Sequence, residues 1–102
     1  MVQVKIDREQ IAAFCQKWQV AELSLFGSVL REDFRPTSDV DVLISFLPEA
    51  RHTLFDMVHM QDELREIFGR EVDLVERTAV EQSRNYIRRR EILNSLEVIH
   101  AA

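Results

Sequence analysis

Residues 23–46 read LSLFGSVLREDFRPTSDVDVLISF, and this stretch decides the fold of the chain. The segments from Leu23 to Phe26 and from Val40 to Phe46 are rich in the β-branched, aromatic and aliphatic side chains that are typical of strands. Gly27 and Ser28 follow the first segment directly, and the residues after them lack this bias. The stretch therefore predicts a strand, a tight turn, a short helix or loop, and a second strand.

Two acids mark the start of the second strand. Side chains alternate across a strand, so Asp39 and Asp41 are expected on one face with their Cα atoms about 6 to 7 Å apart. Acids beside the apolar run Val42 to Ile44 are costly unless something neutralises them. Mg²⁺ binds carboxylates together with phosphate oxygens and water, and two such ions can stabilise both oxygens of a phosphoryl displacement. Asp39 and Asp41 are therefore predicted metal ligands and catalytic residues, although Ser38 and Asp39 alone are also compatible with a turn.

The turn between the strands has the features of an anion site. Gly27 lets the backbone come close to a ligand, and Ser28 offers a hydroxyl beside free N–H groups at an expected helix start. Together they are predicted to hold a triphosphate. Arg31 lies about one helical turn after Ser28, so its guanidinium can reach the same anion. An ion pair of Arg31 with Glu32 or Asp33 explains it equally well.

A third acid lies on a later strand. The segment Glu71 to Glu76 is predicted to be a short strand in which Asp73 is flanked by Val72, Leu74 and Val75. If this strand neighbours the second one, Asp73 joins the other two acids. Its role there is metal ligand and general base for an incoming hydroxyl, which is a weak nucleophile until it loses its proton. The alternative is an acid at a strand end with a helix or arginine partner.

These residues resemble the minimal nucleotidyltransferases of the DNA polymerase β-like superfamily. The resemblance extends past Asp73 to Ser83–Asn85 and Arg89–Leu93, and so covers most of the chain after Val20. Three positions depart from the family pattern, where a glycine, an acid and a proline are common: Glu32, Thr37 and Tyr86. None of them is a proposed metal ligand. The residues of the first motif that carry the resemblance are Gly27, Ser28, Arg31, Arg35, Pro36, Ser38, Asp39 and Asp41.

The resemblance implies a nucleotidyltransferase enzyme that uses ATP with two Mg²⁺ ions. Members are commonly antitoxins that transfer AMP to a tyrosine hydroxyl of a HEPN-domain ribonuclease toxin and so neutralise it. Two alternatives stay open: an antitoxin that acts by binding alone, and a small-molecule transferase similar to those that modify aminoglycosides. The implied nucleotide-binding residues are Gly27, Ser28, Arg31 and Ser38, and the implied catalytic and metal residues are Asp39, Asp41 and Asp73.

Length, charge and cysteine content narrow the class of protein. The 102 residues contain two glycines and two prolines and are expected to form a single domain, residues 1–102. The net charge of −5 argues against direct binding to nucleic acid, which needs a basic surface. One cysteine, Cys15, with neither a signal peptide nor a long apolar stretch predicts a cytoplasmic protein away from membranes.

Two helices with clear boundaries are expected besides the strands. The first begins at Asp7, which pairs with Gln10 in the manner of a capping box. The second runs from Thr53 to Phe68 and ends at Gly69. Alternating strands and helices give an α/β (α+β) fold with a small mixed sheet of three to four strands. We expect the helices to flank one side, with nucleotide and metal on the other side of the first two strands.

The last third of the chain is expected to form one helix and one strand. The helix starts near Thr78 and continues to Leu93, and residues 97–100 form the strand. On such a helix Arg84 and Arg88 share a face. This face could contact an acidic toxin surface or a triphosphate, and the alternative is a face exposed to solvent. So small a domain offers a shallow cleft, whose missing walls come from the acceptor or from another copy of the chain.

Overall fold

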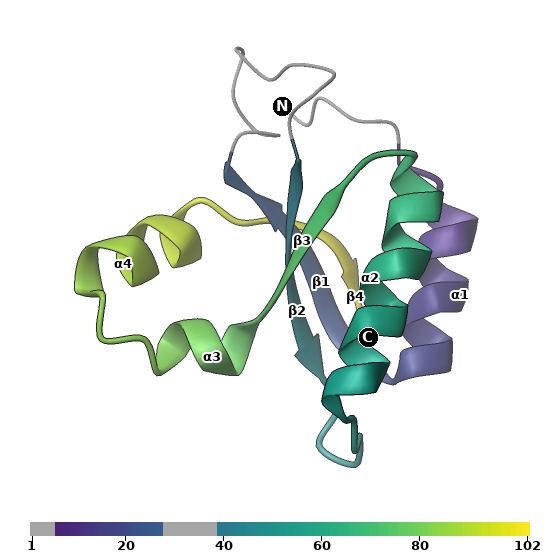
Figure 1. The fold of residues 1–102 in the computed structure, drawn as a ribbon, viewed down its shortest axis with the longest axis horizontal. Coiled ribbons are helices and arrows are strands. Elements are labelled where there is room, and N and C mark those ends of the chain that lie inside the picture. The colour runs from purple at the N-terminus through teal and green to yellow at the C-terminus, as the bar shows by residue number, and fades with distance from the viewer. Residues whose placement is uncertain (1–5, 28–38) are drawn as a thin grey trace.

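The computed structural model describes residues 6–27 and 39–102. Four strands form one mixed sheet in the order β3-β2-β1-β4 (Figure 1). Strand β1 is antiparallel to both β2 and β4, and β2 is parallel to β3. The predicted class, a small mixed sheet flanked by helices, is confirmed. The elements are α1 (Arg8–Trp18), β1 (Val20–Phe26), β2 (Val40–Phe46), α2 (Leu54–Phe68), β3 (Val72–Glu76), α3 (Arg77–Glu81), α4 (Tyr86–Asn94) and β4 (Glu97–Ala101).

The two long helices begin where their capping residues predict. The carboxylate of Asp7 accepts hydrogen bonds from the backbone N–H groups of Glu9 at 3.1 Å and Gln10 at 3.2 Å. Thr53 and Asp56 form a reciprocal capping box at the start of α2. Gly69 ends α2 in the left-handed region, with φ 68°. No helix within residues 6–27 and 39–102 combines the length and apolar character needed to cross a bilayer.

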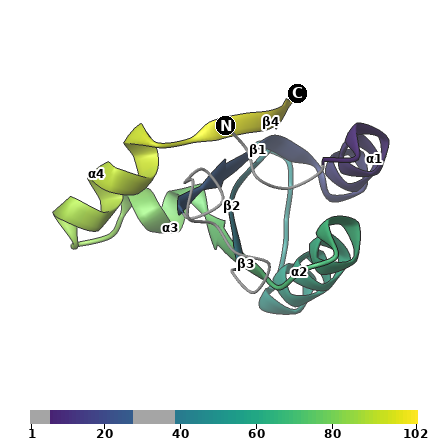
Figure 2. The same ribbon diagram turned by 90° about the horizontal axis from the view of Figure 1, so that it is seen from above.

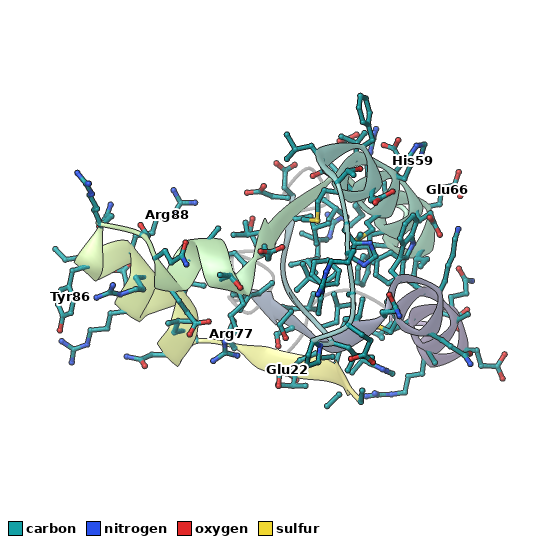
Figure 3. The ribbon with its side chains drawn as sticks, turned by 90° about the horizontal axis from the view of Figure 1, so that it is seen from below. Glu22, His59, Glu66, Arg77, Tyr86 and Arg88 are labelled. Carbon is teal, nitrogen blue, oxygen red and sulfur yellow. The ribbon has the colours of Figure 1, made fainter. Side chains whose placement is uncertain are left out.

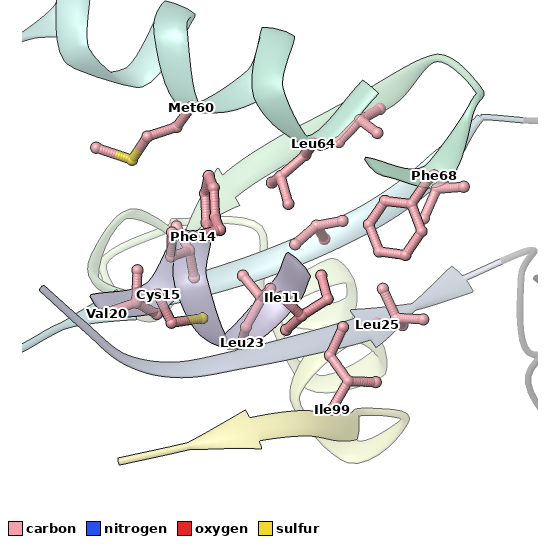
Figure 4. Close-up of a cluster of buried hydrophobic side chains, with 14 residues drawn as sticks. Ile11, Phe14, Cys15, Val20, Leu23, Leu25, Met60, Leu64, Phe68 and Ile99 are labelled. Atoms are coloured by element: carbon pink, nitrogen blue, oxygen red, sulfur yellow. The ribbon is translucent and has the colours of Figure 1, made fainter. Parts of the chain in front are cut away.

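The main core lies between one face of the sheet and the helices α1 and α2 (Figure 4). Alternate residues of each strand point into it, among them Leu23 and Leu25 of β1 and Val42 of β2. Cys15 on α1 is buried in this core, and its burial raises the pKa of the thiol to about 12. The thiol is therefore protonated at neutral pH, and Cys15 packs as an apolar side chain.

The opposite face of the sheet is covered in part by α3 and α4 (Figure 2). Phe26 and Leu43 point to this side and are buried against Val80 of α3 and Ile92 of α4. An ion pair of 3.3 Å between Arg77 and Glu22 of β1 also holds α3 to the sheet (Figure 3). The expectation of helices on one side only is therefore wrong. Two large apolar side chains on the second face require cover, and α3 and α4 provide it.

The single helix expected from Thr78 to Leu93 is in fact two helices. The hydroxyl of Ser83 accepts a hydrogen bond from the N–H of Asn85 at 3.2 Å, and the Asn85 side chain caps α4 at the N–H of Arg88 at 3.1 Å. Short polar side chains that bond nearby backbone compete with helix formation, which explains the break. Arg84 precedes this cap, so the prediction that Arg84 and Arg88 share a helix face is also wrong.

Candidate active site

Two of the predicted acids are direct neighbours across the sheet. Asp41 of β2 is the register partner of Asp73 on β3, and Phe26 of β1 is the partner of Asp41 on its other side. Paired residues point to the same face, and neighbouring strands lie about 4.8 Å apart. These three residues form a row across the face opposite the main core, which we call the acid row. It brings two carboxylates from different strands side by side.

The third predicted acid lies beside this row. Asp39 comes directly before β2, and the N–H of Val40 donates to the carbonyl of Glu71 at 2.9 Å. Val40 is fully buried in the main core, so alternation puts Asp39 on the same side as Asp41. Asp39 and Asp73 are exposed and Asp41 is half-buried. All three acids thus lie at one end of one sheet face.

Gly27 makes room for the Asp41 carboxylate. It follows β1 with φ 73°, in the left-handed region that favours glycine. A Cβ atom at this position would collide with Oδ2 of Asp41 and lie 3.3 Å from its Cγ. The sequence predicted close approach of the backbone to a ligand, and the structure adds a close approach to a carboxylate. The other predicted nucleotide-binding residues, Ser28, Arg31 and Ser38, lie outside the described part of the chain.

The oxygen donors of this end of the sheet fit a hard divalent cation. Carboxylates on two adjacent strands, with a further acid two positions before Asp41, are the ligand type that Mg²⁺ prefers. Among the described residues, no group of three or more acids, histidines or cysteines is arranged to hold a metal by itself. Mg²⁺ in phosphate chemistry typically takes one or two carboxylates and completes its shell with substrate phosphates and water. A pair such as Asp41 and Asp73 suits that mode of binding.

The residues that continue this face beyond the acid row, and the residues of α4, had little signal in the sequence. Leu43 and Val75, which follow Asp41 and Asp73 by two positions, continue the face as a second, apolar row. Arg89 of α4 is half-buried, and its Nη1 donates to the carbonyls of Glu81 and Ser83 at 3.3 Å each. The signal for this arrangement was the capping residue Asn85, which separates α4 from α3.

Comparison with known proteins supports the resemblance deduced from the sequence. A sequence model of the family described as nucleotidyltransferase domain matches residues 7–97. A candidate protein adenylyltransferase of Methanocaldococcus jannaschii, MJ0435, is 37% identical over 68 residues, which are 67% of this chain and 71% of the relative. The protein adenylyltransferase MntA of Thermococcus cleftensis is 31% identical over 65 residues, 64% of each chain.

Solved structures share the same fold. A candidate minimal nucleotidyltransferase superposes with a TM-score of 0.66 at 27% identity, covering 88% of this chain and 86% of the other. A toxin–antitoxin structure with AMP-PNP gives 0.69 at 13% identity, covering 95% and 75%. A structure of the tri-AMPylated Shewanella oneidensis HEPN toxin with its MNT antitoxin gives 0.60 at 12% identity, covering 93% and 70%. The last two show likeness of fold alone.

Proposed function

Because the chain belongs to the nucleotidyltransferase domain family, we propose that it is a protein adenylyltransferase that acts as an antitoxin. It transfers AMP from ATP, with Mg²⁺, to a tyrosine hydroxyl of a HEPN-domain ribonuclease toxin and so neutralises the toxin. Two relatives of 37% and 31% identity carry the name protein adenylyltransferase. Structures that share the fold contain AMP-PNP in one case and an AMPylated HEPN toxin in another.

The observation that carries this proposal is the pairing of Asp41 with Asp73 beside Gly27. Two carboxylates on adjacent strands repel each other. This repulsion favours a bound cation, which can in turn hold a ligand. Neither sits in the main core, so they contribute nothing to apolar packing. Gly27 has no side chain and so leaves space for the carboxylate of Asp41, which also supports a cation site on this surface. Gly27, Asp41 and Asp73 together form the proposed catalytic end of the sheet.

Each residue of this end has a defined task in the proposed reaction. Gly27 and Ser28 hold the phosphate tail through backbone N–H groups and a hydroxyl. Asp39, Asp41 and Asp73 would hold Mg²⁺, which would offset the charge on the phosphate oxygens. Asp73 accepts the proton of the tyrosine hydroxyl as the tyrosine oxygen forms a bond to the α-phosphorus of ATP. The bond from that phosphorus to the bridging oxygen breaks, and pyrophosphate leaves.

The same proposal sets the surroundings of the site. The acid row lies on an exposed sheet end, so the toxin that presents the tyrosine also supplies a wall of the cleft, either alone or with another copy of this chain. The 102 residues act as one nucleotidyltransferase domain. ATP and the RNA that a ribonuclease cuts are both cytoplasmic, and the proposal therefore puts the protein in the cytoplasm.

The direct test is the mass of a co-expressed HEPN partner. With the wild-type chain, intact-mass spectrometry should detect AMP on a tyrosine of the partner. Asp73→Asn should leave the partner unmodified and the cells unprotected from it, because the variant lacks the proposed base. Asp62→Asn is the matched control, since Asp62 is an exposed acid on α2, which covers the opposite face of the sheet from the acid row, and it should leave modification intact.

Two results would contradict the proposal. Protection of cells by Asp73→Asn with an unmodified partner would indicate an antitoxin that acts by binding alone. An unmodified partner with the wild-type chain would also refute AMP transfer to the toxin. In both cases ATP binding by the wild-type chain should be measured separately. Binding would indicate a different acceptor, and its absence would indicate an inactive site.

A further inference from the structure

A cavity of about 160 Å³ lies between β3, α3 and α4. Its apolar wall consists of side chains that come from all three elements, and its polar groups come from the connection between the helices and from α4. The break between α3 and α4 creates this space, since a continuous helix would carry the chain away from β3. The lining residues are Val75, Ala79, Val80, Ser83, Arg88, Arg89 and Ile92.

The cavity adjoins the acid row on the same face of the sheet. Val75, which lines it, follows Asp73 by two residues on β3, so the two side chains point to the same side about 7 Å apart along the strand. Val75 is the register partner of Leu43, which follows Asp41 by two residues on β2. Two residues further along β2 and β3, the carboxylates of the acid row are therefore followed by the apolar wall of the cavity.

Two guanidinium groups lie at the polar rim of the cavity: that of Arg89 is held by hydrogen bonds, and that of Arg88 is exposed to solvent. Arg89 is held by the carbonyls of Glu81 and Ser83, and its guanidinium lies 5.6 Å from the centre of the Tyr86 ring. Arg88 is exposed, and its guanidinium makes no ion pair with any residue in 6–27 or 39–102 (Figure 3 labels both Arg88 and Tyr86 on α4). A planar cation beside an apolar wall is suited to stacking on a flat ring.

We propose that this cavity takes the nucleobase of the bound nucleotide, an inference that rests on the proposed function. A cavity of about 150 Å³ holds one benzene ring, so this space, at about 160 Å³, can take one ring of a planar base while the rest of the base extends through its open side. The ring packs on Val75, Val80 and Ile92. Arg88 stacks on it from the solvent side, as guanidinium groups do on nucleobases. The phosphates then reach the acid row along the same sheet face.

The test fills the cavity from an exposed position and compares two ligands. Ala79→Phe puts a ring into the cavity from α3, whereas Ala12→Phe adds the same ring on the exposed side of α1 as a control. Calorimetry with Mg²⁺ compares ATP with tripolyphosphate, which has phosphates but no base. Ala79→Phe should weaken ATP binding about fivefold or more, the lower range for loss of one stacked base, and leave tripolyphosphate binding unchanged.

A second variant protects the test against a folding defect. Arg88→Ala removes only an exposed side chain and should weaken ATP binding by a smaller factor, again without effect on tripolyphosphate. Unchanged ATP binding in both variants would overturn the proposal, and so would an equal loss for both ligands. ATP binding unchanged in Ala79→Phe while AMP transfer is lost would also overturn it, since the cavity would then take the acceptor ring. Failure of the wild-type chain to bind either ligand would instead refute the proposed function itself.

Discussion

The two faces of the sheet are built from the same strands but have different composition. The face under α1 and α2 holds a continuous cluster of buried apolar side chains from both helices and all four strands. Among the described residues, the face under α3 and α4 has a smaller apolar cluster with four buried side chains, and beyond them it carries the acids Asp41 and Asp73. Alternation along each strand separates the two sets of side chains completely. The difference shows that one face forms the main core, whereas the other carries the exposed acids that we propose for catalysis.

Removal of a side chain from each face should give the largest difference in stability. Leu64 of α2 is fully buried in the main core, so Leu64→Ala should lower the free energy of unfolding by about 2 to 5 kcal/mol. Ile92 of α4 borders the open cavity and is 8% exposed, so Ile92→Ala should fall at or below the lower end of this range. Urea unfolding of both variants measures the two costs. Equal costs would mean that the faces are packed alike.

The two glycines with positive φ offer a second, sharper comparison. Gly27→Ala and Gly69→Ala each force alanine into the left-handed region, at a cost of about 1 to 2 kcal/mol. A Cβ atom on Gly69 has nothing within 4 Å, whereas one on Gly27 collides with the Asp41 carboxylate. We expect similar losses of melting temperature but weaker Mg²⁺-dependent ATP binding for Gly27→Ala alone. The same binding loss in Gly69→Ala would assign the effect to backbone strain.

Local chemistry made most of the first face predictable from the sequence. Asp7 and Thr53 mark helix starts through side-chain bonds to nearby N–H groups, and Gly69 marks a helix end. Such signals depend on a few neighbouring residues, so they survive in any fold. The strand Val40–Phe46 was predicted to the residue because its apolar run stands between turn segments.

The second face was less predictable because it depends on contacts distant in sequence. The capping bonds of Asn85 are local, yet the helix start at Thr78 favoured one continuous helix to Leu93. Nothing near Leu43 in the sequence indicates that Ile92 covers it. For the candidate site, the sequence identified Asp41 and Asp73, but their direct pairing follows only from the parallel register of β2 and β3. The cavity beside them arises from three separate elements and had no sequence signal of its own.

The pH dependence of stability provides a smaller test at the edge of the first face. A backbone hydrogen bond from Thr53, with further contributions from the Thr53 hydroxyl and nearby histidines, holds the pKa of Asp56 below its usual value. A lowered carboxylate pKa stabilises the fold above the unfolded pKa, and this contribution is lost as pH falls through the folded pKa. Asp56→Asn should therefore be less stable than wild type at pH 7, with the difference disappearing as the pH falls through the lowered pKa of Asp56 in the folded state. Thermal unfolding across this range measures it.

Asp62→Asn is the control for this pH test. Asp62 pairs with Arg65 of the same helix at 3.3 Å, an exposed ion pair of the kind that contributes little. A difference from wild type at pH 7 that is as large for Asp62→Asn as for Asp56→Asn would contradict the assignment to the helix cap.

The smallest effect on stability is expected on the acid row. Asp73 is exposed and lies beside another carboxylate, so Asp73→Asn should change the free energy of unfolding by no more than about 0.5 kcal/mol, with a slight gain allowed by relief of repulsion. Urea unfolding without added metal measures it. A loss as large as that of Leu64→Ala would mean that Asp73 serves the fold, and the contrast between the two faces would fail.

The most direct measurement of the central claim is the metal dependence of ATP binding. Calorimetry on the wild-type chain should give clear binding in Mg²⁺ and much weaker binding in EDTA, because the acid row needs a cation before it can hold a triphosphate. In Asp41→Asn the Mg²⁺-dependent part should disappear while the protein stays folded. Equal ATP affinity in Mg²⁺ and EDTA, or unchanged binding in folded Asp41→Asn, would contradict the assignment of this face to nucleotide chemistry.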